Sequence, residues 1–188
     1  MPIEINWFGI GAAECRDVNA PCDVLWDVVT DIDKYPLTLT TVQSIKRVDG
    51  SDAGTPLRPG TKWRQTRDFP KGTENVVEMT VRAIEECDGN NECVGPYPKS
   101  LTITGEFDDR SAMTTITLTV ESAMESNTNG SRLVATFGLV PDGMAQKLAI
   151  AVFGCYLGKK ATDLLSSDLC DIAAEAERIA RTKSNQPL

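Results

Sequence analysis

Hydrophobic and polar residues alternate with a period of two through most of the middle of the chain. The clearest case is Met113–Ser122, where Ile116, Leu118 and Val120 occupy alternate positions between threonines. Such alternation predicts a strand with one buried and one solvated face. Turn-forming pairs separate the segments, and the short connections predict antiparallel neighbours. The predicted strands are Thr41–Asp49, Thr61–Asp68, Thr73–Glu86, Lys99–Phe107, Met113–Ser122 and Arg132–Val140.

Two other elements precede this region. The segment Ile3–Val18 predicts a first strand, which ends at Asn19-Ala20-Pro21. A short helix is predicted over Cys22–Asp31, because its apolar residues share one face and Pro21 stands at its entrance, where a missing N–H costs nothing. The sequence Asp33-Lys34-Tyr35-Pro36 ends this helix.

A long helix closes the chain, predicted from Asp142 or Gly143 to about Arg181. Apolar residues recur there every three or four positions, which predicts one buried stripe that covers the inner face of the sheet. The stripe consists of Met144, Leu148, Val152, Cys155, Thr162, Leu165, Leu169, Ile172, Ala176 and Ile179.

The first half of this helix is rich in small residues, namely Ala145, Ala149, Ala151, Gly154, Gly158 and Ala161. Small side chains on a buried face leave unfilled volume beneath a concave sheet, which predicts an internal cavity. Two alternatives stay open at this point. In the first the small residues serve close helix packing, and in the second Gly154 and Gly158 mark a kink.

Composition narrows the classes of function. The 188 residues fit one domain, residues 1–188, and 19 basic against 27 acidic residues give a net charge of −8, which argues against nucleic acid and favours a monomer. No histidine occurs, so imidazole catalysis and the commonest metal ligand are absent. The loop aspartates lack the spacing of a calcium site. We therefore expect no metal, no cofactor and no histidine-based catalysis.

The N-terminus lacks the basic start of a signal peptide, so we expect a cytoplasmic protein. The longest uncharged stretch, Leu148–Leu157, is about half of what spans a bilayer, and we expect no membrane span. The six cysteines include no Cys-x-x-Cys pair, and a reducing compartment would leave them as thiols. Cys87 and Cys93 are the one pair close enough in sequence to suggest a bridge.

Two motifs stand out in the first half of the chain. The first motif is Ala20-Pro21 followed by Val24-Leu25-Trp26 and Tyr35-Pro36. The second is Gly60-Thr61-Lys62-Trp63 with Arg67. These motifs and the order of the elements resemble the START-like (SRPBCC, Bet v 1-like) superfamily, in its polyketide cyclase/dehydrase and lipid-transport branch, where a Gly-Thr-x-Trp-x-x-x-Arg strand is common. The resemblance covers essentially the whole chain.

The resemblance implies an α+β helix-grip fold. In that fold a seven-stranded curved antiparallel sheet wraps around a long C-terminal helix, with a short helix pair between strands 1 and 2. It also implies a pocket but not its occupant, since the superfamily includes lipid carriers, receptors and cyclases. The chain departs from the branch at Leu37-Thr38-Leu39, where an aromatic residue often follows the Tyr-Pro pair. The resemblance therefore implies no ligand contact at this position of the chain.

Trp63, Gln65 and Arg67 share one face of a predicted strand. If that face points inward, they line the cavity as a stacking surface with polar groups; if outward, their long stems pack flat on the surface. The alternation pattern leaves both orientations of this face open. Met79 is expected to face inward and Glu78 outward, whereas the reverse register would bury Glu78 as a candidate acid or base.

Two tyrosines are further candidates, because a phenol can orient a ligand carbonyl. Tyr97, between two prolines, is predicted in a loop over the cavity mouth, with surface exposure as the alternative. Tyr156 lies on the small-residue half of the helix, with packing against the sheet as the alternative. Trp26 is expected to be a core anchor. The expected ligand-binding set is Trp63, Gln65, Arg67, Met79, Tyr97, Phe107, Phe137, Val152, Cys155 and Tyr156.

The leading hypothesis is a non-catalytic domain that binds or carries a hydrophobic small molecule such as a lipid, sterol, pigment or polyketide. A polyketide cyclase or dehydratase using carboxylate, tyrosine or arginine side chains is the first alternative, and a polar cluster deep in the pocket would favour it. A protein-interaction module is the second alternative, although nothing in the sequence marks the surface it needs.

Overall fold

The computed structural model describes residues 3–6, 9–69, 73–86, 97–107, 112–123, 130–141 and 143–184. Within these ranges the strands form an antiparallel sheet in the order β1-β2-β8-β7-β6-β5-β4-β3. The strands are β1 (Ile3–Asn6), β2 (Gly9–Val18), β3 (Val42–Arg47), β4 (Lys62–Phe69), β5 (Thr73–Glu86), β6 (Lys99–Phe107), β7 (Ala112–Ser122) and β8 (Ser131–Pro141). The helices are α1 (Cys22–Thr30), α2 (Tyr35–Thr38) and α3 (Met144–Ser184), with a 3₁₀ turn, η1 (Ile32–Lys34).

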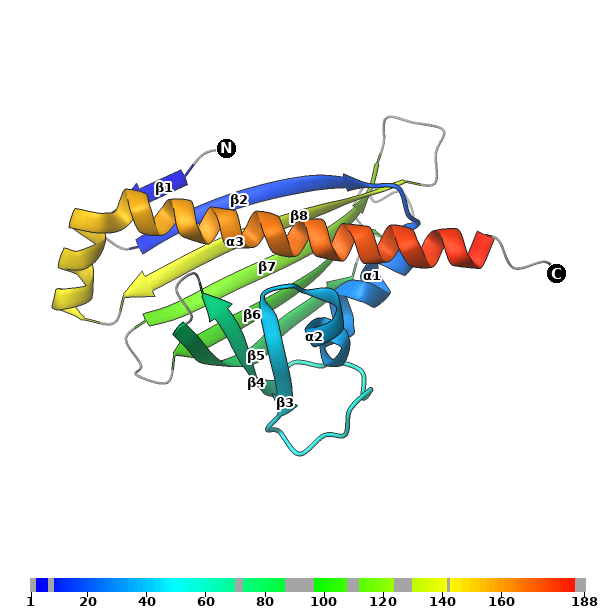
Figure 1. Ribbon diagram of the computed structural model, residues 1–188, viewed down its shortest axis with the longest axis horizontal. Coiled ribbons are helices and arrows are strands. Elements are labelled where there is room, and N and C mark those ends of the chain that lie inside the picture. The colour runs from blue at the N-terminus through cyan, green and yellow to red at the C-terminus, as the bar shows by residue number, and fades with distance from the viewer. Residues whose placement is uncertain are drawn as a thin grey trace.

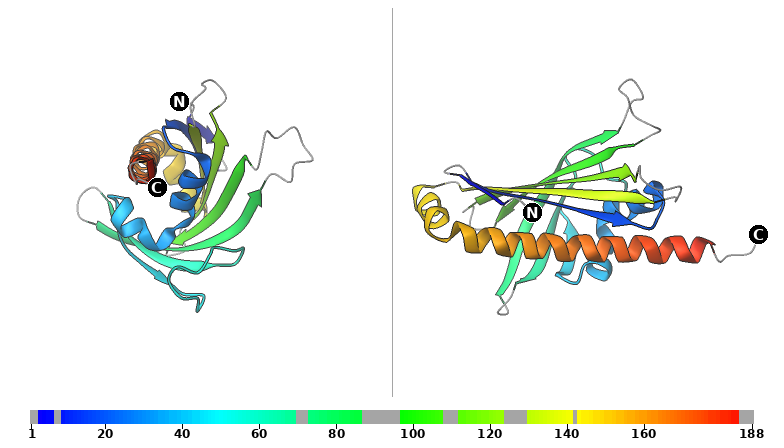
Figure 2. Two further views of the ribbon diagram at one scale, coloured as in Figure 1. Left: turned by 90° about the vertical axis from the view of Figure 1, so that its right-hand side faces the viewer. Right: turned by 90° about the horizontal axis from the view of Figure 1, so that it is seen from above.

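The sheet curves around α3, which lies along its concave side and extends past the sheet at its C-terminal end (Figures 1 and 2). Helices α1 and α2 close one end of the concave side. This arrangement confirms the helix-grip fold and the short helices between the first two predicted strands. The long helix and the six middle strands lie within three residues of their predicted bounds.

The segment predicted as one first strand forms two strands in the structure. The segment Ile3–Val18 divides into β1 and β2, which pair antiparallel with Asn6 opposite Gly9, so β1 adds an eighth strand at the edge of the sheet. Asn6 and Gly9, at the two ends of the reversal, are residue types favoured in tight turns, and the adjacent apolar residues Trp7 and Phe8 interrupt the alternation. The sequence therefore contained a turn signal that the prediction of a single strand overlooked.

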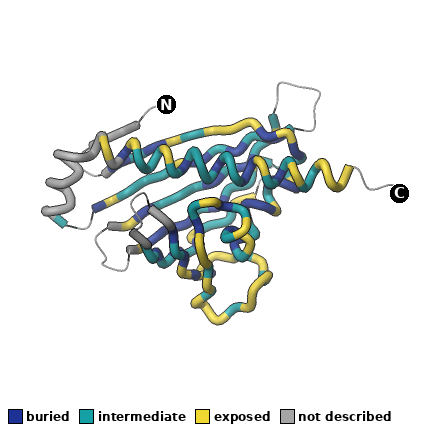
Figure 3. Tube along the Cα trace, viewed as in Figure 1, coloured by how far each residue is buried: buried dark blue, intermediate teal, exposed yellow. Residues whose placement is uncertain are grey.

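The core lies between the concave face of the sheet and α3 (Figure 3). Leu101, Val120 and Leu133 come from three adjacent strands and are fully buried, as is Ala176 of the helix. On β5, Met79 and Val81 are buried, whereas Glu78 pairs with Lys62 and Arg64 on the outer face. The expected register of this strand is therefore confirmed, and Glu78 is not a buried acid.

In the described part of the chain, Cys15, Cys22 and Cys170 are free thiols. The pair Cys87 and Cys93 lies outside the described residues. No helix in the described segments combines the length and apolar character needed to cross a membrane.

Gly105 is a point of close approach on the concave face. A Cβ atom added there would lie 2.6 Å from Thr114 Oγ1 and 2.7 Å from Met79 Sδ. Met79 can shift, but Thr114 is a stiff β-branched residue whose hydroxyl donates to the Gly105 carbonyl. We expect Gly105→Ala to lower the free energy of unfolding by roughly 1 to 3 kcal/mol in urea denaturation. Gly138→Ala, with its nearest atom 4.0 Å away, is the control and should change little.

Arg47 holds the β3–β4 loop against η1. Its Nε and Nη2 bind the Asp33 carboxylate at 3.1 and 2.9 Å, while Nη1 donates to Ser51 Oγ and Nη2 to the Thr55 carbonyl. The Arg47 side chain is 6% exposed and that of Asp33 is 19% exposed. The guanidinium stabilises the ionised carboxylate, and the pKa of Asp33 is therefore below its ordinary value.

We expect Asp33→Asn to destabilise the fold by roughly 3 kcal/mol at neutral pH, since it leaves a buried guanidinium without its anion. Because the folded-state pKa of Asp33 is lowered, the pair stabilises the fold above the unfolded pKa of about 4 and loses this contribution as pH falls through the folded pKa. The difference between wild type and variant should therefore shrink in acid. A pH-independent difference would contradict this role for the carboxylate, and Asp17→Asn, at an exposed ion pair, is the control.

Candidate ligand-binding pocket

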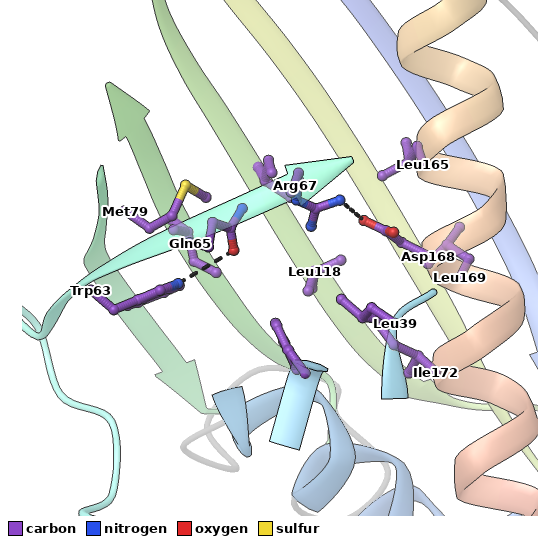
Figure 4. Close-up of a pocket in the computed structure, with 13 residues that line it drawn as sticks. Leu39, Trp63, Gln65, Arg67, Met79, Leu118, Leu165, Asp168, Leu169 and Ile172 are labelled. Carbon is purple, nitrogen blue, oxygen red and sulfur yellow. Dashed lines mark hydrogen bonds and ion pairs between the residues drawn. The ribbon is translucent and has the colours of Figure 1, made fainter. Parts of the chain in front are cut away.

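β4 presents Trp63, Gln65 and Arg67 on the concave face of the sheet. All three are buried, and Trp63 is 1% exposed. The intervening residues Lys62 and Arg64 are exposed on the other face, as the strand period requires. The structure therefore resolves the open question from the sequence, since this face of β4 points inward (Figure 4).

These residues line a cavity between the sheet and α3. The floor comes from four adjacent strands and the roof from α2 and the C-terminal half of α3. The lining residues are Tyr35, Leu39, Trp63, Gln65, Arg67, Met79, Ile103, Ile116, Leu118, Leu165, Asp168, Leu169 and Ile172. The cavity volume is about 40 Å³. That is room for a few water molecules, and it is smaller than the several hundred cubic ångströms of a typical small-molecule site.

A buried ion pair lies in the pocket wall. Arg67 Nη1 donates to Asp168 Oδ2 at 2.8 Å and to Thr41 Oγ1 at 3.0 Å, and Thr41 Oγ1 donates to Asp168 Oδ1 at 2.8 Å. The side chains of Arg67 and Asp168 are 9% and 15% exposed. Both carboxylate oxygens thus have a donor, which a buried anion requires. The triangle joins β4, the start of β3 and α3.

The corner between α2 and β3 is tied to α3 a second time. Thr40 donates to Asp171 Oδ2 through both its amide and its hydroxyl, at 2.8 Å each. Asp168 and Asp171 are three residues apart and therefore lie on the same side of the helix. The two contacts hold the Leu39 side of the pocket wall against α3.

The other polar lining groups are arranged around the indole and the phenol. Trp63 Nε1 donates to Gln65 Oε1 at 3.4 Å, and Figure 4 shows the amide nitrogen of Gln65 on the side away from Trp63. Tyr35 OH donates to the Val29 carbonyl at 2.6 Å. Burial, with the nearby Asp168 charge, raises the pKa of Tyr35 well above its ordinary value, so its proton stays in place at neutral pH.

Of the residues predicted to bind ligand, Trp63, Gln65, Arg67 and Met79 come together in this pocket. Phe137 is half-buried on the concave face as the cross-strand partner of Ile116, directly beside it. Of the remaining predicted residues with described side chains, Tyr97 and Tyr156 do not line it. Tyr156 is 56% exposed and lies against the ammonium of Lys160. Phe107, Val152 and Cys155, and most of the small-residue half of α3, have side chains outside the described set.

Tyr97 lies outside the pocket. It is half-buried, and the Lys99 ammonium lies 5.5 Å from its ring and 5.8 Å from the ring of Trp26. Burial, together with the charges of Cys22, Asp23, Asp27 and Glu86, raises the pKa of Tyr97 to about 12. Trp26 is half-buried rather than a fully buried core anchor. Its ring lies at the surface of α1, where the ammonium of Lys99 from β6 packs over it. This cluster joins α1 to β6.

Sequence reasoning missed Tyr35, Leu39 and Asp168 as pocket residues. Leu39 is buried while Leu37 is 89% exposed, so the position that departs from the branch still contributes an apolar wall. For Asp168 a signal was present. It falls between Leu165 and Ile172 in the apolar stripe of α3, and an acid on a buried stripe needs a buried cation.

Together these features define a helix-grip domain with a mainly apolar pocket that contains a few convergent polar groups. Residues 18–126, more than half of the chain, match the model of the family described as "polyketide cyclase / dehydrase and lipid transport". The chain belongs to this family, which is part of the START-like superfamily. No curated protein matches the chain in sequence at a significant level.

Solved structures show the same fold at low sequence identity. A START superfamily protein from Mycobacterium smegmatis matches with a TM-score of 0.64 and 12% identity over 90% of this chain and 98% of that one. An aromatase/cyclase from a Streptomyces species matches with a TM-score of 0.65 and 13% identity, over 89% of this chain and 93% of that one. A major latex-like protein from Panax ginseng matches with a TM-score of 0.61 and 13% identity, over 90% of this chain and 98% of that one.

Proposed function

We propose that the chain is a ligand-binding domain, which holds a hydrophobic small molecule against the concave face of the sheet beneath α3. The observation that carries the proposal is the convergence of Trp63, Gln65 and the Arg67–Asp168 pair in an otherwise aliphatic pocket. A pocket of this kind buries an apolar body and orients it through a few polar atoms. Lipids, sterols, pigments and polyketides all have this character.

The family supports the class of ligand. Its description covers polyketide cyclases and dehydrases together with lipid transport, and both polyketides and lipids are hydrophobic molecules that carry oxygen atoms. One structural relative is an aromatase/cyclase by name. The shared fold supplies the concave sheet and the long helix, and the polar groups on the wall are those of this chain.

The cavity volume of about 40 Å³ accommodates only the polar end of such a molecule. We infer that the apolar body extends along the concave face from Ile116 to its neighbours Phe137 and Leu139. These three side chains remain partly accessible although they point toward α3, so apolar surface is available there. Binding of a larger ligand then requires side chains such as Met79 to shift, which an unbranched thioether does readily.

Hydrogen bonding in the pocket favours binding over proton transfer. The Asp168 carboxylate accepts hydrogen bonds from Arg67 and Thr41, and the Tyr35 hydroxyl donates a hydrogen bond to the Val29 carbonyl. A general base needs a free acceptor within reach of the substrate. We therefore favour a carrier or receptor of the ligand over an enzyme.

Native mass spectrometry of protein purified without organic solvent tests this function. We expect an adduct of a few hundred daltons that a mild organic extraction removes, together with saturable binding of the uncharged probe N-phenylnaphthylamine by the extracted protein. Absence of both the adduct and the probe binding would refute the proposal. The same gently purified sample should elute as a monomer, because a charge of −8 opposes self-association.

A polyketide cyclase or dehydratase is the second candidate, and the polar cluster deep in the pocket favours it. Arg67 lies where it would polarise a ketone, and folding of a poly-ketone chain in a shaped cavity is catalysis by positioning. Incubation with a linear poly-β-ketone analogue decides between the candidates. Formation of a cyclised product faster than in buffer, and its loss in the double variant Arg67→Met/Asp168→Leu, whose stability is expected to be near that of wild type, would establish the enzyme.

A further inference from the structure

The charges of the pocket cancel each other. Arg67 and Asp168 are the charged members of the lining among the described residues, and they are paired at 2.8 Å. Tyr35 keeps its proton because burial raises its pKa, and Trp63 and Gln65 are uncharged. The wall that a ligand meets is therefore polar but electrically neutral.

The hydrogen bonds of Asp168 hold its negative charge beside the positive charge of Arg67. Its two oxygens accept from Arg67 and Thr41, and Thr41 also accepts from Arg67, so the three groups hold each other in place. Asp171, one turn further along α3, anchors the neighbouring Thr40. The carboxylate thus remains beside the guanidinium and offsets its field at short range, where screening by solvent is weak.

We propose that Asp168 makes the pocket select uncharged ligands, such as ketones, esters, alcohols or aromatic compounds, and reject carboxylates and other anions. The inference rests on the proposed function, because it specifies the ligand of the same pocket. It assigns to Asp168 a role in specificity that acts through Arg67.

The physical basis is the cost of burying charge. An anion that enters the pocket loses its hydration, and its attraction to Arg67 is opposed by repulsion from Asp168. A neutral oxygen loses little hydration and can accept from the guanidinium, whose bonds to Asp168 and Thr41 both use Nη1. Without Asp168 the same guanidinium would be an uncompensated cation in an apolar pocket, which is an anion site.

A matched pair of fluorescent probes tests this selectivity. N-phenylnaphthylamine is uncharged, and anilinonaphthalene sulfonate has the same ring system with one added sulfonate. We expect wild type to bind the uncharged probe at least about tenfold more tightly. Asp168→Asn should reduce or reverse that ratio by increasing the affinity for the sulfonate. Asp163→Asn removes the same charge from an exposed position of α3 that is not part of the lining, and should leave the ratio unchanged.

The outcomes separate this inference from the proposed function. If wild type binds neither probe, the proposed function fails. If it binds both with equal affinity or prefers the sulfonate, or if Asp168→Asn binds the sulfonate no better, the inference is overturned. If Asp168→Asn does not fold, the inference is tested by the ratio of the two probe affinities in wild type and in the variant Arg67→Met/Asp168→Leu. That variant is neutral in the pocket and should keep the preference for the uncharged probe, and loss of the preference would refute the inference.

Discussion

Arg67→Met is expected to destabilise the fold by roughly 3 to 5 kcal/mol, because it leaves the Asp168 carboxylate buried without its cation. Thr41 would still donate one hydrogen bond, which does not replace a charge. The loss also removes the tie between β4 and α3, while Thr40 and Thr41 still bind Asp171 and Asp168 of the helix. Urea denaturation followed by circular dichroism measures the difference directly.

The double variant Arg67→Met/Asp168→Leu tests whether the unpaired Asp168 charge causes this loss of stability. Replacing both partners by apolar residues of similar size removes the unpaired charge, so most of the stability should return. A double variant no more stable than Arg67→Met alone would contradict a direct interaction between the two side chains. Arg178→Met, at the exposed ion pair with Glu175, is the surface control and should change stability little.

Leu165→Trp is expected to abolish binding of a hydrophobic ligand, with a loss of affinity of about a hundredfold or more. Leu165 projects from α3 into the pocket (Figure 4), and a tryptophan there has enough extra volume to fill a cavity of about 40 Å³. Binding of N-phenylnaphthylamine, followed by its fluorescence, gives the affinity. Thermal unfolding of the same sample verifies that the variant is folded.

Leu164→Trp is the matched control, since the residue precedes Leu165 on the helix and is not part of the lining. It adds the same side chain and should keep probe binding close to that of wild type. If the two variants bind equally well, the ligand does not occupy this pocket, and the proposed site is wrong.

Most of the fold could be predicted because its signals are local. Strict alternation defined strands such as Met113–Ser122, and the spacing of apolar residues defined α3. The hairpin of β1 and β2 was missed although Asn6 and Gly9 mark the reversal, because the two residues are not adjacent as in the other turn pairs. Burial of Met79 rather than Glu78 followed from the chemistry of the two side chains.

The pocket was less predictable, because it depends on contacts between distant segments. The sequence identified Trp63, Gln65 and Arg67 as candidates, but the alternation pattern is the same whichever face of β4 points inward. The inward orientation of these three residues became clear only from the packing of β4 against α3. Asp168 pairs with a residue about a hundred positions away, so no local pattern connects them. Tyr97 and Tyr156 looked suitable by residue type alone, and the structure places both outside the pocket.

Fluorotryptophan NMR is the most direct test of ligand binding in this pocket. The chain has three tryptophans, and substitution of each assigns its resonance. Because Trp63 lines the pocket and Trp26 lies at the surface of α1, addition of N-phenylnaphthylamine should shift the Trp63 resonance and leave that of Trp26 in place. Saturable probe binding with an unchanged Trp63 resonance would contradict the proposed site.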